Sequence, residues 1–408
     1  MQPTTRRGFR NLLLSSIYAL GVFGILASGD GDNDVVRAFT CGLSIQGIAP
    51  VGDGTVWVGV FAKTNSDTED RVVLLDTDGS ELESYLIGNG GSENAIRAIA
   101  RATDGSNDVY VGGDFIRGIS RGILRLNSDG SLDTDFDVGT GFNGRVTAIV
   151  PLTNGQVYVA GYFTEFGVDS VSGLVRLNSD GSWDNAGFIT VPGVTDIDSV
   201  VLGTDAPFVD YLYSGGTGLN QLSRWESNGI RDGAFNPIFG PVFSVVPAAD
   251  SSGNIYYGGR FTNNIIRLTE IGTTDMVFNV GTGFDNDVLS IDRAASGGIY
   301  VGGDFTTYDV DNSNGIARIN GNGTLDGSFM VGSGFTDPNG IFPFSKVASV
   351  IQDTSGSDDV FVGGGFTEYN GVPSNGIVRL DTVGSPAAFN VSINIDGEVC
   401  NSQTIPDS

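Results

Sequence analysis

Carboxylates are the most abundant groups in this sequence that could do chemistry, and histidine is absent. The chain of 408 residues has 48 acidic residues, 21 basic residues and no His. Nine of the acidic residues are Glu, which leaves 48 − 9 = 39 Asp. The lack of His excludes Ser-His-Asp and Cys-His catalysis, His-ligated zinc and imidazole proton transfer. Paired acids that cleave glycosides and oxygen ligands for calcium are the two chemistries left open.

One internal stretch has the spacing of a calcium loop. Asp309, Asp311 and Ser313 alternate along the chain, and calcium takes several oxygen ligands from such loops. Calcium is therefore the one cofactor that the sequence suggests. For the composition as a whole, an acidic solubilising surface with Asp in turns is the favoured interpretation.

The charge balance also bears on partners. A net charge of −27 and a pI near 4.1 disfavour nucleic acid and anionic lipid, because both are bound by basic faces. The sequence has no nucleophile elbow, phosphate loop or Cys/His metal set. With 39 Asp, a chance pair of carboxylates is almost unavoidable, so their abundance does not indicate an enzyme. We therefore expect a protein that binds rather than catalyses.

The amino terminus has the features of an export signal. Residues 5–10, Thr-Arg-Arg-Gly-Phe-Arg, precede an apolar run over 12–27 and then small residues, which predicts a signal peptide over 1–29. The twin-arginine and general secretory routes both stay open. No second apolar stretch follows, so we expect no membrane insertion after the signal is removed. The mature protein would be periplasmic, surface-bound or extracellular, with an acidic lead-in over 30–40.

The remainder of the chain is built from seven copies of one motif, of which 109–115, Val-Tyr-Val-Gly-Gly-Asp-Phe, is the clearest. The copies begin at Val56, Val109, Val157, Tyr211, Ile255, Ile299 and Val360. A period near 50 residues is typical of a repeat architecture. Each copy lies between an apolar run and a third run ending in Arg and an apolar residue, and a short stretch centred on Phe follows. The β-branched and aromatic residues and the Gly/Asn/Asp turns predict strands throughout.

Short antiparallel sheets of this kind cannot bury both faces alone, so the repeats must pack on one another. Closure into a ring protects the sheet edges. We therefore expect an all-β, seven-bladed β-propeller over 41–400 with four-stranded antiparallel blades, and a tail over 401–408. Ring closure would lie near the termini, where Cys41 and Cys400 flank the array. These two cysteines form either a disulfide across the seam or two separate buried thiols.

The repeat motifs resemble those of the delta-60 repeat family of bacterial β-propellers. The resemblance rests on V-Y-V-G-G-D-F, I-A-R-L/I-N, D-G-S/T-L-D and G-x-G-F, and residues 109–142 and 299–335 carry it best. It implies a propeller fold. It implies no catalytic residues, because none are assigned in that family.

Alternate connections of an antiparallel blade emerge on the same side, so one face should collect the ends of the second strands. Asp114, Arg260 and Asp304 would lie on this face. Binding in repeat folds concentrates where the units differ. The recurring phenylalanines of the motif, in contrast, are expected in the core, as are the recurring glycines at close approaches.

Three longer loops place an aromatic residue beside polar groups. They contribute Glu165 and Phe166, then Tyr308, then Glu368 and Tyr369. Such aromatics can stack on sugars or enter a protein interface. Packing of each loop on its own blade is the favoured alternative. Together with Asp114, Arg260 and Asp304, these residues form our predicted ligand-binding set.

The sequence thus predicts an exported binding module for a protein or carbohydrate ligand. A carboxylate-based polysaccharide hydrolase or lyase is one alternative. A structural subunit of an extracellular assembly, which would self-associate, is another.

Overall fold

The structure is a computed structural model, and it describes residues 42–63, 68–89, 96–189, 193–203, 211–217, 222–235, 240–295, 297–337, 347–374, 376–395 and 398–401. The predicted signal peptide, the lead-in and Cys41 lie outside these residues. Every element in the described part is a β-strand. The described residues contain no helix long and apolar enough to cross a membrane.

Seven larger antiparallel sheets follow one another along the described chain, and we number them in sequence order. Sheet 1 contains β1 (Gly42–Pro50), β2 (Val56–Lys63), β3 (Thr68–Leu75) and β4 (Glu81–Asn89); sheet 2 contains β5 (Ile96–Arg101), β6 (Val109–Arg117) and β7 (Ser120–Leu126); sheet 3 contains β8 (Arg145–Pro151), β9 (Val157–Tyr162) and β12 (Leu174–Leu177); sheet 4 contains β13 (Ile197–Leu202), β14 (Leu212–Gly216) and β15 (Leu222–Trp225).

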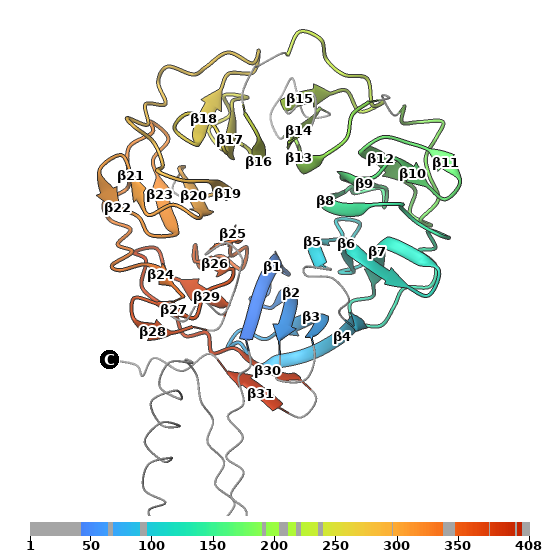
Figure 1. The fold of residues 1–408 in the computed structure, drawn as a ribbon, viewed down its shortest axis with the longest axis horizontal. Helices are drawn as coiled ribbons and strands as arrows, with labels where there is room; N and C mark the ends of the chain where they lie inside the picture. The colour runs from blue at the N-terminus through green and yellow to red at the C-terminus, as the bar shows by residue number, and fades with distance from the viewer. Residues whose placement is uncertain are drawn as a thin grey trace, which may run out of the picture.

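The second half of the chain repeats the arrangement. Sheet 5 contains β16 (Val242–Pro247), β17 (Ile255–Gly259) and β18 (Ile265–Leu268); sheet 6 contains β19 (Val288–Arg293), β20 (Ile299–Gly303) and β23 (Ile316–Ile319); sheet 7 contains β25 (Ser349–Gln352), β26 (Val360–Gly363) and β29 (Ile377–Leu380). The sheets stand around a common centre, with the first strand of each sheet innermost (Figure 1). The recurring motif is the middle strand of every sheet.

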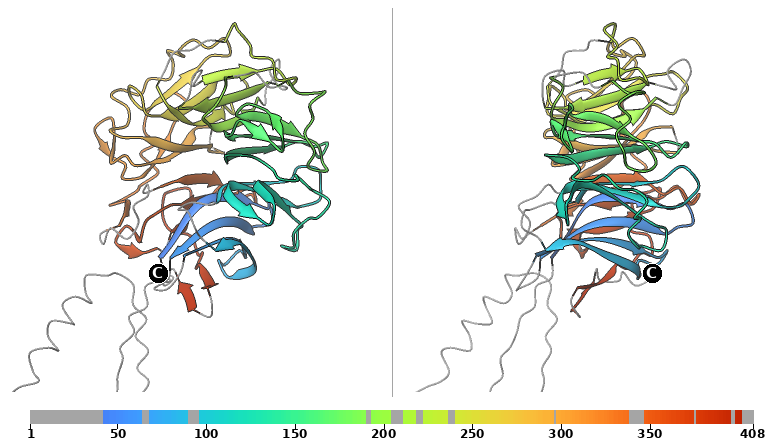
Figure 2. Two further views of the ribbon diagram at one scale, coloured as in Figure 1. Left: turned by 45° about the vertical axis from the view of Figure 1, so that its right-hand side comes forward. Right: turned by 90° about the vertical axis from the view of Figure 1, so that its right-hand side faces the viewer.

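Smaller pairs of strands decorate this array. They are β10 (Glu165–Phe166) with β11 (Asp169–Ser170), β21 (Thr307–Tyr308) with β22 (Asp311–Asn312), β24 (Phe335–Thr336) with β27 (Glu368–Tyr369) and β28 (Val372–Pro373), and β30 (Ser392–Ile395) with β31 (Glu398–Asn401). The last pair lies at the outer edge of sheet 1 (Figures 1 and 2), where the Ser392 N–H donates to the carbonyl of Gly79 over 3.2 Å.

The expectation of four strands per sheet is wrong for sheets 2 to 7 in the described residues. The Phe-centred stretch meets the third strand only at an isolated bridge, such as Ile319 with Leu325 in sheet 6. The backbone then turns, because the Asp326 carboxylate accepts a hydrogen bond from the Ser328 N–H at 2.9 Å and the Asp326 carbonyl accepts one from Phe329 at 3.1 Å. Such local turns compete with an extended strand. Only sheet 1 has a regular fourth strand, β4.

The core lies between the sheets rather than within them. Each of seven buried apolar clusters combines residues of two neighbouring sheets. One cluster joins Ile45 and Ile48 of sheet 1 to Phe361 and Ile377 of sheet 7. Of the motif phenylalanines, Phe115, Phe163, Phe305 and Phe366 are buried and Phe261 is partly buried, so the expectation of core positions is confirmed for four of the five.

In six of the seven sheets a glycine of the middle strand permits this close contact, whereas sheet 3 has Ala160 at the equivalent position. A Cβ added to Gly112 would lie 2.7 Å from Val146 Cγ1 of the next sheet, and one added to Gly302 would lie 2.6 Å from Val347 Cγ1. Real Cβ atoms do not approach so closely, so a larger residue would push the sheets apart. A Cβ on Gly363 of sheet 7 would meet Ile45 Cγ2 of sheet 1 at 2.8 Å. The first and last sheets therefore meet in the same way as neighbours in sequence.

Candidate functional site

Four recurring residues, a Tyr, an Arg, an Asp and a Phe, form a buried structural cluster in each of sheets 2 to 6. In sheet 6 the rings of Tyr300 and Phe329 meet edge to face at 5.5 Å, and the Arg318 guanidinium carbon lies 5.3 Å from the centroid of Phe329. Arg318 forms an ion pair with Asp326 at 2.7 Å. The same Arg-to-Asp pairing, eight residues apart, occurs at Arg125–Asp133, Arg176–Asp184, Arg224–Asp232 and Arg267–Asp275.

Several of these arginines also fasten neighbouring sheets. Arg176 of sheet 3 donates to the Ser227 carbonyl of sheet 4 at 3.0 Å, and Arg318 donates to the Thr382 carbonyl of sheet 7 at 2.6 Å. Their donors are occupied by the fold. The recurring Tyr, Arg, Asp and Phe therefore hold the repeats together and are poor candidates for ligand binding.

The three predicted loop aromatics are buried. Phe166, Tyr308 and Tyr369 have 7 %, 2 % and 0 % of their surface exposed. Each packs on a phenylalanine: Phe166 on Phe142, Tyr308 on Phe284 and Tyr369 on Phe335, with ring centroids 4.6–4.9 Å apart. The Tyr369 hydroxyl donates to the Gly384 carbonyl at 2.6 Å, and the Tyr308 hydroxyl donates to the Gly323 carbonyl. Burial raises the pKa of both phenols. Each aromatic thus packs its loop against the core, as the favoured alternative predicted, and no ring face is left for a sugar.

The acidic neighbours of these aromatics are not gathered either. Glu165 is exposed on β10, and the partly buried Glu368 accepts a hydrogen bond from the Thr336 hydroxyl at 3.3 Å. Glu165 lies on the loop that follows the middle strand of sheet 3, and Glu368 on the equivalent loop of sheet 7. The structure does not bring them together.

The predicted calcium ligands do not converge. Asp309 accepts hydrogen bonds from the Thr282 N–H and hydroxyl, both at 3.0 Å, which lowers the pKa of this carboxyl. Asp311 is exposed on β22, whereas Ser313 is buried. The described residues hold no group of three acidic, Cys or His side chains that could surround a metal. The alternation of residues 309–313 is that of a hairpin.

Two of the three predicted face residues, Arg260 and Asp304, contact the same residue, Asp287. Arg260, at the end of the middle strand of sheet 5, forms a hydrogen-bonded ion pair with Asp287 at the start of sheet 6. The Asp304 N–H donates to the carbonyl of the same Asp287 at 3.0 Å. Arg260 is 68 % exposed in its side chain, so this end of the sheets is open to solvent. Asp114 lies elsewhere, near Arg97.

Asp114 belongs to a polar cluster on the first and middle strands of sheets 2 to 4 that the sequence did not single out. The Arg145 guanidinium carbon lies 3.8 Å from the centroid of the Tyr162 ring. The Tyr162 hydroxyl donates to Asp198 at 2.7 Å and lies 3.0 Å from the Thr217 hydroxyl. We call Arg97, Asp114, Arg145, Tyr162, Asp198 and Thr217 the inner-rim cluster.

The two arginines and two aspartates of the inner-rim cluster do not form close ion pairs with the described residues. No carboxylate in the described part lies within 4.0 Å of Arg97 or Arg145, unlike the recurring arginines. The buried Nε atoms of Arg97 and Arg145 and the buried Oδ2 of Asp198 have no hydrogen-bond partner. Burial, and then the charge of Arg145, holds the pKa of Arg97 below its usual range. Burial raises the pKa of Asp198.

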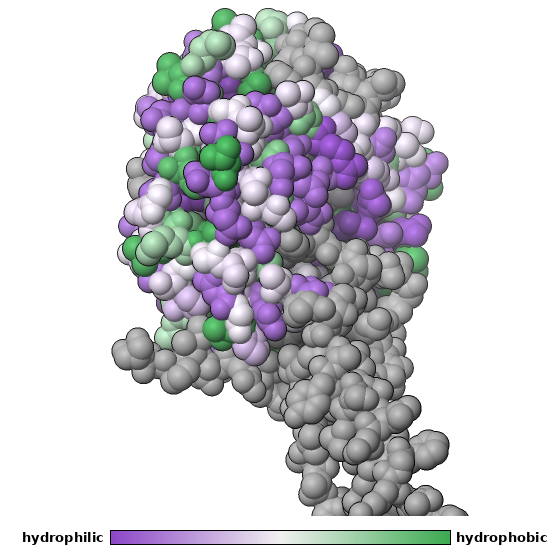
Figure 3. All heavy atoms as spheres, turned by 60° about the vertical axis from the view of Figure 1, so that its left-hand side comes forward, coloured by the Kyte–Doolittle hydropathy of each residue, from purple (hydrophilic) through white to green (hydrophobic). Residues whose placement is uncertain are grey.

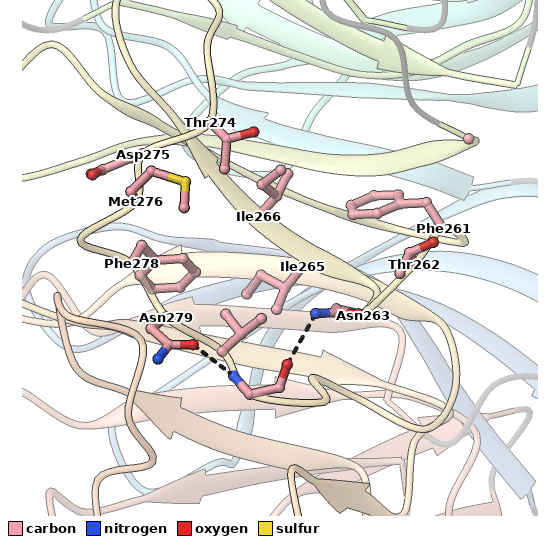
Figure 4. Close-up of a pocket in the computed structure, with 13 residues that line it drawn as sticks. Phe261, Thr262, Asn263, Ile265, Ile266, Thr274, Asp275, Met276, Phe278 and Asn279 are labelled. Carbon is pink, nitrogen blue, oxygen red and sulfur yellow. Dashed lines mark hydrogen bonds between the residues drawn. The ribbon is translucent and has the colours of Figure 1, made fainter.

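Two cavities occupy equivalent places in sheets 5 and 2. The larger, of about 680 Å³, is lined by apolar residues such as Phe261, Ile265, Met276 and Phe278, with Asn263 at its edge (Figure 4). The smaller, of about 210 Å³, is lined by the corresponding Phe115, Ile123, Thr134 and Phe136.

The length of one loop distinguishes these two sheets from three others. In sheet 5 three residues separate the motif phenylalanine, Phe261, from Ile265 at the start of the third strand. In sheet 2 seven residues separate Phe115 from Ile123, the residue equivalent to Ile265. Ten residues occupy this place in sheets 3, 6 and 7, and each loop carries one of the buried aromatics. The cavities thus lie in repeats that lack the packed aromatic loop.

The surface around sheets 5 to 7 is mixed. Exposed apolar residues there include Ile271, Met276, Val310 and Met330. Hydrophobic residues form small separate groups among hydrophilic residues on the face seen in Figure 3.

Comparisons with known proteins support the architecture. Residues 106–136, 152–186, 294–329 and 357–386 match the model of a family described as a domain of unknown function (DUF5122) β-propeller. A search of curated proteins found no match. A functionally unknown protein from Desulfotomaculum acetoxidans DSM 771 has a similar structure, with a TM-score of 0.50 and 13% identity over 78% of this chain and 90% of that chain.

Sqt1 from Chaetomium thermophilum reaches a TM-score of 0.49 at 13% identity, over 85% of this chain and 83% of that chain. Likeness at this level of identity concerns the fold alone. The chain is a β-propeller repeat protein, and four of its repeats are similar to those of the DUF5122 family.

Proposed function

We propose that this chain is an exported, closed seven-bladed β-propeller of the delta-60 type that binds a glycan on the face where the middle strands end. Closure is supported by the packing of Gly363 against Ile45 and by the apolar cluster shared by sheets 7 and 1. A disulfide between Cys41 and Cys400 would fasten the same seam. Export rests on the sequence of residues 1–29.

The variation of one position among the repeats is the observation that carries the binding site. The residue after the Gly-Gly or Ala-Gly pair of the middle strand is Asp114, Tyr162, Thr217, Arg260 or Asp304 in sheets 2 to 6, and it is Gly365 in sheet 7. These side chains differ in charge, size and hydrogen-bonding capacity, whereas the Tyr, Arg and Phe of the buried clusters recur. Repeat proteins bind ligands where their units differ. The face also carries both donors and acceptors, which suits a polyhydroxylated ligand better than an apolar one.

A glycan array with the mature protein tests this proposal. We expect a bound glycan whose signal falls in Tyr162→Ala and Arg260→Ala and persists in Asp129→Asn. Asp129 lies in the turn after the third strand, at the opposite end of an antiparallel sheet, and serves as the control. Binding that survives both face variants, or that Asp129→Asn also removes, would contradict the proposed site.

Two further outcomes separate the alternatives. Release of shorter sugars from a bound glycan would make the protein a hydrolase or lyase, with Asp198 as an acid whose pKa is already raised by burial. An array without any bound glycan would reject glycan binding and favour a protein ligand or a structural subunit. Light scattering at micromolar concentration then distinguishes these two, since a structural subunit should self-associate.

A further inference from the structure

We infer that the inner-rim cluster binds a sugar acid, with Arg97 and Arg145 holding its carboxylate. This inference rests on the proposed glycan-binding function and names the ligand class. It begins from an anomaly of charge. In a chain of net charge −27, the recurring arginines form close ion pairs with aspartates, whereas Arg97 and Arg145 have no carboxylate of the described residues within 4.0 Å. Asp114 and Asp198 act on Arg97 only from a greater distance.

The two arginines are brought together by the fold at some cost. Arg97 is the second residue of the first strand of sheet 2, and Arg145 begins the first strand of sheet 3. Both side chains are partly buried, and the charge of Arg145 acts on Arg97. Two like charges that are partly removed from water repel one another. An anion placed between them would relieve this repulsion and accept hydrogen bonds from both guanidinium groups. A carboxylate fits best because a planar guanidinium can bind both of its oxygens.

The other members of the cluster indicate what else the ligand carries. The Oδ2 of Asp198 is buried without a donor, and Asp114 and Thr217 supply further acceptors nearby. A ligand that presented only a carboxylate would leave these acceptors unused. A sugar acid presents hydroxyl donors within a few ångströms of its carboxylate, so it satisfies the arginines and the acceptors together. Tyr162 orients both Arg145 and Asp198, since its ring stacks on the Arg145 guanidinium and its hydroxyl donates to the Asp198 carboxylate.

Isothermal titration of the mature protein with galacturonate and glucuronate oligosaccharides tests the inference. We expect binding that weakens about tenfold or more in Arg97→Gln and in Arg145→Gln, because each removes a charge-assisted hydrogen bond. Arg145→Lys, which keeps the charge and loses the planar fork, should weaken binding less. Arg101→Gln is the matched control, because Arg101 lies at the far end of the same strand as Arg97 and its guanidinium donates to Asn107. It should bind as the wild type does.

Three comparison ligands complete the experiment. The methyl esters and neutral counterparts of the same sugars should bind at least about tenfold more weakly, since they lack the charge that the arginines recognise. Neutral sugars that bind as well as the acids, unaffected by Arg97→Gln and Arg145→Gln, would overturn the sugar-acid assignment and leave the proposed glycan function standing. An Asp/Glu-rich peptide that binds through the two arginines, while no sugar acid does, would overturn both. Thermal melting of each variant, with an unchanged melting temperature, ensures that lost binding is not lost folding.

Discussion

The backbone N–H of Asn390 donates to the carbonyl oxygen of Asp78 over 2.6 Å, which joins the segment after sheet 7 to the β3–β4 turn of sheet 1. Four other pairs of sheets share this bond between the residue after the recurring Phe and the residue before a turn glycine: Asp137 with Asp180, Ile189 with Asn228, Asn279 with Asn322, and Met330 with Val383, at 2.8–2.9 Å. The contact between the ends of the array is thus of the same kind as its internal contacts. This equivalence is the strongest support for a closed ring.

The recurring ion pairs, such as Arg318–Asp326, should contribute far more to the free energy of unfolding than the exposed pair of Arg260 with Asp287. Asp326→Ala leaves Arg318, whose side chain is 9 % exposed, without its carboxylate, and breaking a buried pair costs on the order of 3 kcal/mol. Arg260→Ala removes a pair whose arginine is 68 % exposed, and such pairs contribute at most about 1 kcal/mol. Urea denaturation of both variants checks the difference. Equal losses of stability would contradict the structural role of the recurring pair.

The side chain of Tyr369 should stabilise the fold in two ways that can be measured separately, through its hydroxyl hydrogen bond and through the packing of its ring. Tyr369→Phe removes the hydroxyl that donates to Gly384, and we expect a loss of about 1–2 kcal/mol in the free energy of unfolding. Tyr369→Ala also removes the packing on Phe335 and Phe366, for a loss of about 3–5 kcal/mol. Sheet 3 has Phe166 at this place and so lacks the hydroxyl naturally. An alanine variant as stable as the wild type would show that the ring is not buried.

Ionisation of the Asp198 carboxyl should make the folded protein less stable as the pH rises. Burial raises the pKa of its carboxyl, so the folded protein holds this proton more tightly than the unfolded chain does. Stability from this group is therefore greatest at low pH and declines as the pH rises from the unfolded pKa through the raised folded value. Asp198→Asn should melt above the wild type at pH 7, and the difference should shrink towards pH 4. The opposite pH trend would mean that the carboxylate is stabilised in the fold.

Asp180 should behave in the opposite sense. Its hydrogen bonds from the Ser182 hydroxyl and N–H, at 2.6 and 2.9 Å, lower the pKa of the carboxyl. The stabilisation is therefore present above the unfolded pKa and is lost as the pH falls through the lowered folded value. Asn322 makes the same turn without a charge. The Asp180→Asn variant should thus have the melting temperature of the wild type at pH 7. Between pH 7 and pH 3 its melting temperature should fall less than that of the wild type. An equal fall in both proteins would count against this role.

The repeat pattern predicted the sheets well because each recurring residue has one structural use. Gly112 permits the approach of Val146, and Tyr110 meets Phe136 edge to face at 5.3 Å. Most repeats use the same residue type for these contacts, so the pattern is visible in the sequence, although sheet 3 has Ala160 in place of the glycine and sheet 7 has Phe361 in place of the tyrosine. The fourth strand was mispredicted because its apolar spacing is that of a strand, whereas Asp326 turns the backbone through hydrogen bonds that spacing does not reveal.

The candidate site was harder to predict because its parts come from different repeats. Arg97, Arg145 and Asp198 are each ordinary within their own strands, and only the order of sheets around the centre brings them together. The loop aromatics posed the converse problem. Tyr308 and Tyr369 stand among polar residues in the sequence, but the loops fold back and bury them. Sheet 7 departs from the recurring Arg–Asp pair in a way that was also hard to predict. Ala387 replaces the recurring Asp there, and Arg379 instead forms an ion pair with Asp353 at 2.8 Å.

Amide hydrogen exchange at the seam tests the proposed ring most directly. The Asn390 amide, which donates to Asp78, should exchange as slowly as the Asn279 and Met330 amides, which make the equivalent bonds between sheets in the middle of the array. Mass spectrometry of peptides covering residues 388–393, 277–281 and 328–332 measures all three. Matching protection is the predicted result. Exchange at Asn390 at the rate of an unstructured chain, with the other two protected, would show that the array is open and would contradict the closed propeller.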